Sequence, residues 1–259
     1  MALIRMEHLP ESVKVNLPLN IILPEPGEIK GVPVRDRKVL YLLHGLGDDA
    51  SAWQRYTSIE TYAQRYGLVV VMPSVGRSFY LDQPNGQLYF TYLVEELPRY
   101  LEEVFGIAPS RERTLIAGLS MGGCGAIKAA LLHPERYFAA ASFSGVLSLA
   151  ILESQPDHPD VKEFESLFGN LSRVTGSEHD PMIWLERAAG HPEILPSLYA
   201  SCGLDDEIYP LTVMFRDACK KWNVPLDYHE TPGKHDWYFW DAEIQRFLTS
   251  VLKPLNNEE

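Results

Sequence analysis

The stretch that decides the fold spans residues 114–137 and reads TLIAGLSMGGCGAIKAALLHPERY. Residues 114–118 are an apolar run typical of a buried strand, and residues 122–133 are rich in alanine and predict a helix. Between them, residues 118–122 (GLSMG) fit the pattern G-x-S-x-G, which marks a sharp turn from strand to helix around a serine. The two glycines leave room for strand and helix to approach closely. The sequence therefore predicts a strained elbow centred on Ser120.

Ser120 is the first candidate for chemistry. The elbow would hold its hydroxyl above a sheet edge and at the N-terminus of a helix, where backbone N–H groups and the helix dipole favour negative charge. That environment suits a nucleophile. The alternative is that Ser120 only caps the helix, because serine is a favoured N-cap residue. The strand before it and the helix after it favour the nucleophile.

The elements around the elbow alternate between strand and helix. The segments 2–7 and 13–23 alternate in polarity and predict an antiparallel pair at the edge of the sheet. Apolar runs typical of strands buried on both faces occupy residues 39–43, 68–73, 114–118, 139–145 and 198–203, with a less apolar run at 224–232. Helical patterns lie between them at residues 59–66, 89–105, 122–133, 209–222 and 237–252. This order predicts an α/β protein with a mostly parallel central sheet of about eight strands, flanked by helices.

One interval interrupts the alternation. Residues 146–196 are rich in Pro, His, Glu and Asp and contain only short helical patterns. An insertion of this length after a strand more often covers a site than forms a separate domain. We therefore expect a single domain over residues 1–259, with a lid-like insertion at 146–196.

The composition limits the classes of partner. The net charge is −12 and no run of Lys or Arg occurs, which argues against binding to nucleic acid or anionic membranes. The N-terminal segment lacks the apolar region of a signal peptide, and no apolar run is long enough to cross a bilayer, so we expect a cytoplasmic protein. Three cysteines without a C-x-x-C pair predict buried thiols rather than disulfides or zinc ligands. A homo-oligomer is compatible with this composition.

A serine nucleophile needs a base late in the chain, because in this type of fold the order is serine, acid, histidine. Of the eight histidines, His235 follows the last predicted strand in a turn before the final helix. From there its side chain can reach over the carboxyl edge of the sheet. The others precede the serine, end its helix, fall in the insertion or lie within the last strand: His8, His44, His133, His158, His179, His191 and His229.

The acid is expected at the end of the preceding strand. Asp205 and Asp206 both follow the run at 198–203, where a carboxylate can hold an imidazole in its working tautomer. Two adjacent acids cannot both point at one histidine. We assign Asp206 as the acid and Asp205 as a solvent-facing or capping neighbour. The alternative is that both only cap the following helix.

Acyl transfer also needs donors for the developing oxyanion. The backbone N–H of Met121 directly follows the nucleophile, and the loop LLHGLGDD (42–49) follows an earlier strand with glycines that allow close approach. We assign the second donor to Leu46, with Gly45 as the alternative. His44 is expected to brace this loop rather than to titrate in catalysis.

The same loop offers a rival function. Residues 45–50 (GLGDDA) satisfy G-x-G-x-x-A after a strand, as in a dinucleotide-binding fingerprint. Asp48 and Asp49 would repel a pyrophosphate, and the next strand ends without an acid for the ribose. Metal binding is also disfavoured, because HETPGKH (229–235) has the wrong ligand spacing and no other cluster has a suitable one.

With these residues placed, the chain resembles the esterase D group of the α/β-hydrolase superfamily, especially bacterial tributyrin esterases and related feruloyl or acetyl esterases. The resemblance implies a serine carboxylic-ester hydrolase that acts on a small-molecule ester and needs no cofactor or metal. It implies Ser120, Asp206 and His235 as the catalytic set and an oxyanion hole near Leu46 and Met121. The matching stretches are LLHGLGDDASAW, YGLVVVMPSVGRSFY, EELPRYLEEVF, AGLSMGGCGAIKAAL, CGLDDEIY and GKHDWYFWD, which run from Leu42 to Asp241.

The substrate is less constrained. Trp53, Tyr80, Trp184 and Trp237 are candidates to line an acyl or alcohol pocket, although buried aromatic residues belong to the core more often than to a site. Short-chain acyl esters, including acetyl and feruloyl esters, fit such a pocket. Two alternatives stay open: a thioesterase of the S-formylglutathione hydrolase type, and a non-enzymatic protein that kept the hydrolase shape.

Overall fold

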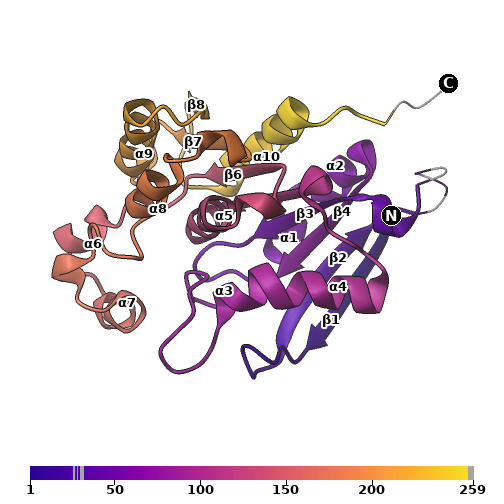
Figure 1. The fold of residues 1–259 in the computed structure, drawn as a ribbon, viewed down its shortest axis with the longest axis horizontal. Helices are drawn as coiled ribbons and strands as arrows, with labels where there is room; N and C mark the ends of the chain where they lie inside the picture. Colours follow the sequence, from indigo (N-terminus) through magenta and orange to yellow (C-terminus); the bar gives the residue numbers. More distant parts are fainter. Residues whose placement is uncertain (26, 28, 30–31, 256–259) are drawn as a thin grey trace.

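The computed structural model describes residues 1–25, 27, 29 and 32–255, and its strands form one sheet between two layers of helices (Figure 1). The strand order is β1-β2-β4-β3-β5-β6-β7-β8. β1 pairs antiparallel with β2, β2 pairs antiparallel with β4, and the remaining neighbours are parallel. The strands are β1 (Ala2–His8), β2 (Leu17–Leu23), β3 (Lys38–Leu43), β4 (Leu68–Pro73), β5 (Thr114–Leu119), β6 (Ala139–Phe143), β7 (Ser197–Gly203) and β8 (Asp227–Thr231). The predicted sheet and its antiparallel edge are confirmed.

Three strand boundaries differ from the prediction by two residues or more, each for a local reason. β2 begins at Leu17 rather than at residue 13, because Lys14 takes a left-handed backbone conformation (φ 63°). β6 ends at Phe143 rather than at residue 145, because Ser144 is also left-handed (φ 46°). β8 begins at Asp227 rather than at residue 224, because the Val224 N–H bonds back to the Cys219 carbonyl at 2.9 Å. A left-handed residue cannot continue a strand.

The helices cover both faces of the sheet. One face carries α3 (Tyr89–Thr91), the π-helical turn η2 (Tyr92–Glu96), α4 (Leu97–Phe105), α5 (Met121–Leu132), α8 (Pro181–Ala188) and α9 (Tyr209–Lys221). The other face carries α1 (Ala52–Tyr56), α2 (Ile59–Tyr66) and α10 (Trp237–Val251). The predicted single helix over residues 89–105 is interrupted by the π turn, and the short α1 was not predicted.

The core divides along the pleat of the strands. In β3, Val39, Tyr41 and Leu43 pack in the cluster under α5, whereas Leu40 and Leu42 pack in the cluster under α10. Successive side chains of a strand point to opposite faces, so a strand covered on both sides must be apolar throughout. Each such side chain stabilises the fold by about 1.5–3 kcal/mol. The continuous apolar runs in the sequence are the direct result.

The contacts of α5 with β5 and with the end of β3 leave no space for side chains at the two elbow glycines. A Cβ on Gly118 would lie 2.4 Å from the carbonyl carbon of Gly122, and a Cβ on Gly122 would lie 2.6 Å from the carbonyl oxygens of Leu43 and His44. These neighbours are backbone atoms that cannot move aside. The G-x-S-x-G pattern is therefore required by packing as well as by the turn.

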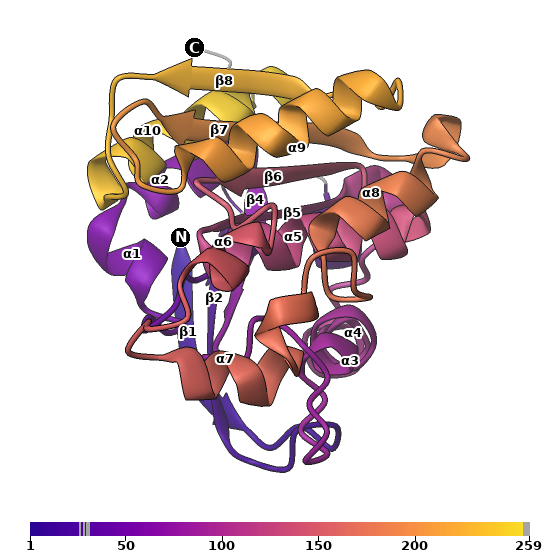
Figure 2. The same ribbon diagram turned by 90° about the vertical axis from the view of Figure 1, so that its left-hand side faces the viewer.

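Residues 146–196 join β6 to β7 and contain α6 (Ala150–Ser154), α7 (Val161–Phe168), α8 and short 3-10 turns. Figure 1 shows α6 and α7 at one side of the molecule, beyond the sheet, and in Figure 2 this side faces the viewer. The segment contacts the loop after β4. Arg77 donates to Glu163 at 2.7 Å and to Asp160 at 2.7 Å, and the Phe79 ring meets Phe164 and Phe168 edge-on.

Membrane-spanning helices are not found in the described part of the chain, because its helices lack the length or the apolar character that a span requires. Cys124, Cys202 and Cys219 are buried free thiols. The prediction of buried thiols is confirmed.

The elbow contact can be tested with Gly122→Ala. The added methyl meets two carbonyl oxygens at 2.6 Å, so we expect the free energy of unfolding to fall by about 3 kcal/mol or more. Gly190→Ala is the matched control, since its new Cβ would meet only the Arg187 carbonyl oxygen at 3.4 Å. Urea unfolding of both variants measures the effect. Equal stability of the two variants would contradict this account of the elbow.

Candidate active site

Ser120 occupies the elbow between β5 and α5 in a strained backbone conformation, with φ 50° and ψ −119°. Its backbone is held on both sides. The Ser120 N–H donates to the Phe143 carbonyl at 3.0 Å, and its own carbonyl accepts from Cys124 at 3.1 Å and Val146 at 3.4 Å. A non-glycine residue persists in such a conformation only where the surroundings fix it.

The hydroxyl of Ser120 does not cap the helix that follows. Ser120 stands at the N-cap position of α5, but its side chain makes no capping hydrogen bond within the described structure. The residue is partly exposed, at the carboxyl end of β5. The alternative of a merely capping serine is thus disfavoured, because a capping serine would accept from a backbone N–H in the first helical turn.

His235 and Asp206 form a direct pair. The Nδ1 atom of His235 lies 2.9 Å from one carboxylate oxygen of Asp206 and 3.1 Å from the other. The loops that carry them follow β8 and β7, which are parallel neighbours, so both loops leave the same edge of the sheet. The loops touch: a Cβ on Gly203 would lie 2.3 Å from the Gly233 carbonyl oxygen. The side chain of Asp206 is fully buried, whereas that of His235 is 23% exposed.

Asp206 remains a carboxylate in spite of its burial. Burial raises the pKa of its carboxyl, but hydrogen bonds from His235, from the Ile208 N–H and from Ser144 outweigh this and leave the pKa below its ordinary value. An ionised Asp206 accepts the Nδ1 proton of His235, which leaves Nε2 with a lone pair. Asp205 is exposed, and its N–H bonds to the Gly233 carbonyl at 2.9 Å. The structure therefore pairs Asp206, and not Asp205, with the imidazole.

Contacts lead from His235 through Trp240 to Ser144, which is next in sequence to the residue that binds the Ser120 backbone. The imidazole meets the Trp240 ring edge-on at 5.0 Å, and the Trp240 N–H donates to the Ser144 hydroxyl at 3.2 Å. Ser144 follows Phe143, the acceptor of the Ser120 N–H. No hydrogen bond joins the Ser120 hydroxyl to His235 among the described residues. Catalytic hydrogen bonds are often long in free enzymes and tighten when substrate binds.

The loop after β3 approaches the nucleophile closely. A Cβ on Gly45 would lie 3.6 Å from the Ser120 Cβ and 2.5 Å from a methyl carbon of Leu119. Met121 is the first residue of α5, so its N–H has no acceptor within the helix. Neither this N–H nor that of Leu46 donates to another group in the described part of the chain. Two backbone N–H groups therefore have no acceptor among the described residues: that of Met121, directly after Ser120, and that of Leu46, in the loop that approaches Ser120 at Gly45.

His44 stabilises this loop through hydrogen bonds of its ring, as predicted. It is buried, and the burial lowers the pKa of its imidazole. Its Nε2 accepts from the Val75 N–H at 3.1 Å, so the ring proton sits on Nδ1, which donates to the Gly45 carbonyl at 2.8 Å. A neutral ring in one tautomer is the only form compatible with both contacts.

Comparison with known proteins agrees with this arrangement. Residues 11–250 match the family described as "Putative esterase". The chain belongs to this esterase family. It is 29% identical over 254 residues to an acetyl esterase of Caldicellulosiruptor saccharolyticus, covering 94% of this chain and 96% of that protein. The esterase D resemblance and the serine carboxylic-ester hydrolase expected from the sequence are confirmed.

Two solved structures from Staphylococcus aureus are similar over nearly the whole chain. The fluorophosphonate-binding serine hydrolase FphF is 35% identical with a TM-score of 0.87, covering 97% of this chain and 98% of its own. The S-formylglutathione hydrolase FrmB is 35% identical with a TM-score of 0.85, covering 97% and 99% respectively. The fold of this esterase is the α/β-hydrolase fold.

The aromatic candidates for substrate contact occupy different environments in the esterase. Trp53, Tyr80 and Trp184 are buried, with exposures of 1%, 0% and 2%. The Trp53 N–H donates to the Leu43 carbonyl at 2.9 Å and the Trp184 N–H to the Glu178 carbonyl at 2.7 Å. Their burial favours the packing alternative for these three. Trp237 is half-buried and stacks on the exposed Tyr56 at 4.9 Å.

Lys128 is a buried cation that the sequence did not single out. It lies on α5, and its Nζ sits 3.9 Å from the centre of the Phe90 ring and 3.3 Å from the Tyr80 carbonyl oxygen. Burial lowers the pKa of its ammonium to about 8. The alanine-rich sequence around it predicted a helix packed on the sheet, and nothing in that sequence indicated that the lysine is buried.

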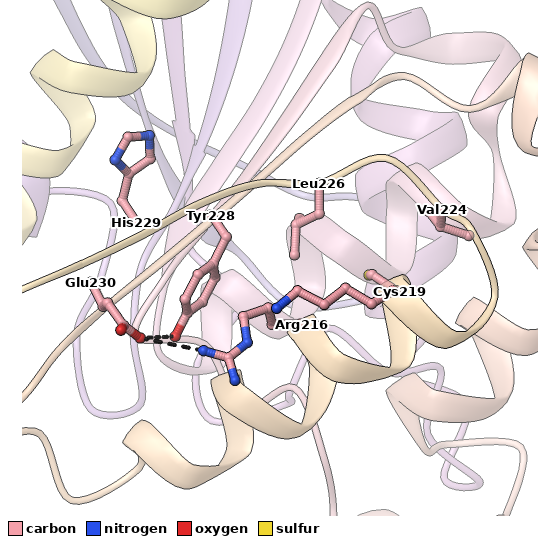
Figure 3. A pocket seen from close by; sticks show the side chains of 8 residues that line it. Arg216, Cys219, Val224, Leu226, Tyr228, His229 and Glu230 are labelled. Atoms are coloured by element: carbon pink, nitrogen blue, oxygen red, sulfur yellow. Dashed lines mark hydrogen bonds and ion pairs between the residues drawn. The ribbon is translucent and has the colours of Figure 1, made fainter.

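A further surface pocket, of about 520 Å³, lies between β8 and α9. Figure 3 shows the Arg216 guanidinium reaching Glu230 beside Tyr228, with His229 pointing away from Arg216. This pocket contains none of the candidate catalytic residues. Groups of three or more metal-ligating side chains are not found among the residues that the structure describes.

Asp206→Asn tests the acid. An asparagine keeps the shape but holds the imidazole in the wrong tautomer, so we expect kcat for p-nitrophenyl acetate to fall by about ten-thousandfold. Asp205→Asn is the matched control. Asp205 is exposed and does not pair with His235, so the substitution should change kcat by less than about threefold. Similar losses in both variants would contradict the assignment.

Lys128→Met tests the buried cation. The pKa of the Lys128 ammonium is about 8 in the folded protein, below its value in the unfolded chain. Between pH 8 and 10.5 the unfolded chain therefore binds more protons than the folded one, and the free energy of unfolding of the wild type rises with pH. We expect Lys128→Met to be more stable than wild type at pH 7, by an amount that shrinks by roughly 3 kcal/mol by pH 10.5. Urea unfolding at several pH values measures this. Lys220→Met, at an exposed position, should differ from the wild type in free energy of unfolding by the same amount at every pH. If the difference for Lys128→Met were also independent of pH, the prediction would be wrong.

Proposed function

We propose that this esterase hydrolyses short-chain carboxylic esters through an acyl-enzyme on Ser120, with His235 as general base and Asp206 as its partner. The observation that carries the proposal is the His235–Asp206 pair, in which both carboxylate oxygens lie within 3.1 Å of Nδ1. The pair lies at the same sheet edge as Ser120, whose backbone is strained and whose hydroxyl makes no capping hydrogen bond. Leu46 and Met121 supply the oxyanion donors.

The first half of the reaction forms the acyl-enzyme. The Ser120 oxygen attacks the ester carbonyl carbon while its proton passes to His235 Nε2, and the carbonyl π electrons move to the oxygen. The Leu46 and Met121 N–H groups stabilise this oxyanion. When the tetrahedral intermediate collapses, the bond to the alcohol oxygen breaks, and His235 gives its proton to the departing alcohol.

The second half repeats these steps with water. His235 takes a proton from water, whose oxygen attacks the acyl carbon, and the bond to Ser120 breaks as its oxygen regains the proton. The carboxylic acid leaves. Asp206 stays ionised throughout and stabilises the imidazolium that forms twice in the cycle.

The substrate assignment rests on the relatives. The acetyl esterase relative supports a small acyl group, and acetyl, butyryl or feruloyl esters of small molecules are the proposed class. We assign residues 146–196 as a lid over this edge, since they join the carboxyl end of β6 to the start of β7. Trp237, beside Trp240 at 5.2 Å, is the proposed aromatic contact. The cytoplasmic location stays a prediction from the sequence.

A thioesterase is the second candidate, because FrmB, an S-formylglutathione hydrolase, is 35% identical over nearly the whole chain. The same serine, base and oxyanion donors would cleave a thioester. Values of kcat/KM for S-formylglutathione and p-nitrophenyl acetate, measured side by side, separate the two functions.

Ser120→Ala tests the proposal directly. We expect loss of covalent labelling by a fluorophosphonate and a fall in kcat of about a millionfold, because the nucleophile is removed while binding remains. The matched control is Ser110→Ala, since Ser110 precedes β5 and lies at its opposite end. Labelling detected by intact-protein mass spectrometry, together with ester turnover, decides the outcome. Labelled Ser120→Ala would place the nucleophile elsewhere.

A further inference from the structure

Two consecutive residues in the loop after β4 take the left-handed backbone conformation. Phe79 has φ 52° and Tyr80 has φ 53°, and neither is a glycine. Such conformations are uncommon for large side chains and persist only where several contacts hold them. The two rings go to different places: Phe79 packs against α7, whereas Tyr80 is fully buried next to His44, with ring centres 6.0 Å apart.

We propose that Tyr80 is a positioning residue for the oxyanion hole. In this inference, which rests on the proposed function, its hydroxyl holds the His44 carbonyl and thereby fixes the peptide that presents the Leu46 N–H. Tyr80 contacts neither substrate nor reacting atoms. It acts through the loop after β3.

Tyr80 is wedged between the nucleophile helix and this loop. Its hydroxyl donates to the His44 carbonyl oxygen at 3.1 Å. Its ring lies over Gly125 of α5, where an added Cβ would come within 2.6 Å of a ring carbon. The ring therefore sets the spacing between the helix that begins after Ser120 and the loop that carries the second donor.

The hydrogen bonds continue from His44 to the donor peptide. His44 Nδ1 donates to the Gly45 carbonyl at 2.8 Å, and the Asp48 N–H donates to the same oxygen at 3.2 Å. In a trans peptide the N–H points opposite to the carbonyl. With the Gly45 carbonyl fixed on one side, the Leu46 N–H faces the other, away from His44. A tilt of the His44 backbone would rotate this donor.

Lys128 and Ser78 hold Tyr80 in its strained conformation. The Lys128 ammonium donates to the Tyr80 carbonyl at 3.3 Å, and the Tyr80 N–H donates to the Ser78 hydroxyl at 3.1 Å. Both polar groups of the left-handed residue are thus satisfied inside the protein. The Tyr80 hydroxyl has one acceptor among the described residues, the His44 carbonyl. A phenylalanine at position 80 would fill the same space but could not donate a hydrogen bond to the His44 carbonyl.

Tyr80→Phe is the decisive variant. We expect kcat for p-nitrophenyl acetate to fall about 10- to 100-fold with KM within about twofold, because only a transition-state contact is misaligned. An alkylboronic acid adds to the serine and places an oxygen in the oxyanion hole. Its inhibition constant should rise by about the same factor as kcat/KM falls, as for any transition-state analogue.

Tyr66→Phe is the matched control, because Tyr66 is also buried and its hydroxyl bonds to Thr249 at 2.9 Å on the other face of the sheet. It should keep wild-type kcat and boronate inhibition. Wild-type values in Tyr80→Phe, or equal losses in the two variants, would overturn the proposal. If Tyr80→Phe does not fold, Lys128→Met decides: a fall in kcat of about three- to tenfold with a matching rise in the boronate constant supports the proposal, and unchanged values refute it.

The outcome also separates this inference from the proposed function. An inactive wild type that resists fluorophosphonate labelling would mean that the proposed function itself is wrong. An active wild type with an equally active Tyr80→Phe would leave the function intact and remove only the role of Tyr80.

Discussion

The close approach of β5 to α5 is the constraint on which the site depends. An added Cβ on Gly118 would lie 2.4 Å from the backbone of Gly122, and one on Gly122 would lie 2.6 Å from the carbonyl oxygens of Leu43 and His44 at the end of β3. This contact forces the chain to reverse direction within Ser120, and the left-handed conformation of that residue follows from it. The free energy for holding the strain comes from the sheet core, where apolar strands are covered on both faces. A looser contact would leave the hydroxyl on an ordinary capping turn.

The remaining groups reach Ser120 because parallel strands end at one edge. Asp206 follows β7 and His235 follows β8, and the parallel pairing of these strands brings the two loops to the same edge, where the pair forms. His44 follows β3, the neighbour of β5 on the other side. Each group is then fixed by further hydrogen bonds: the Asp206 carboxylate accepts from the Ile208 N–H of its own loop, the His44 ring accepts from the Val75 N–H, and the His44 carbonyl accepts from the Tyr80 hydroxyl. Catalytic geometry in this esterase is therefore a property of the whole sheet edge.

Much of this was predictable from local patterns. The apolar runs predicted the strands because burial on both faces requires them, and the order serine, acid, histidine led to Ser120, Asp206 and His235. The sequence could not predict the start of β2, because the left-handed Lys14 carries no glycine signal. Tyr80 was one candidate for substrate contact, because the sequence does not distinguish an aromatic residue in a pocket from one in the core. Its role depends on contacts with His44 and Lys128, which lie far away in the sequence.

The distribution of strain has a physical rationale. Of the six non-glycine residues with positive φ in the described part of the chain, Phe79, Tyr80, Ser120 and Ser144 follow strands β4, β5 or β6, on the side where chemistry is proposed, whereas Lys14 and Asn223 lie elsewhere. Flexible glycines at these positions would relieve the strain but would also allow the donors and the nucleophile to move. An oxyanion hole stabilises charge only if its donors are already oriented when the charge develops. In this proposal the bulky, strained Tyr80, held by the buried Lys128 and in contact with the neutral His44, gives that orientation without reorganisation during the reaction.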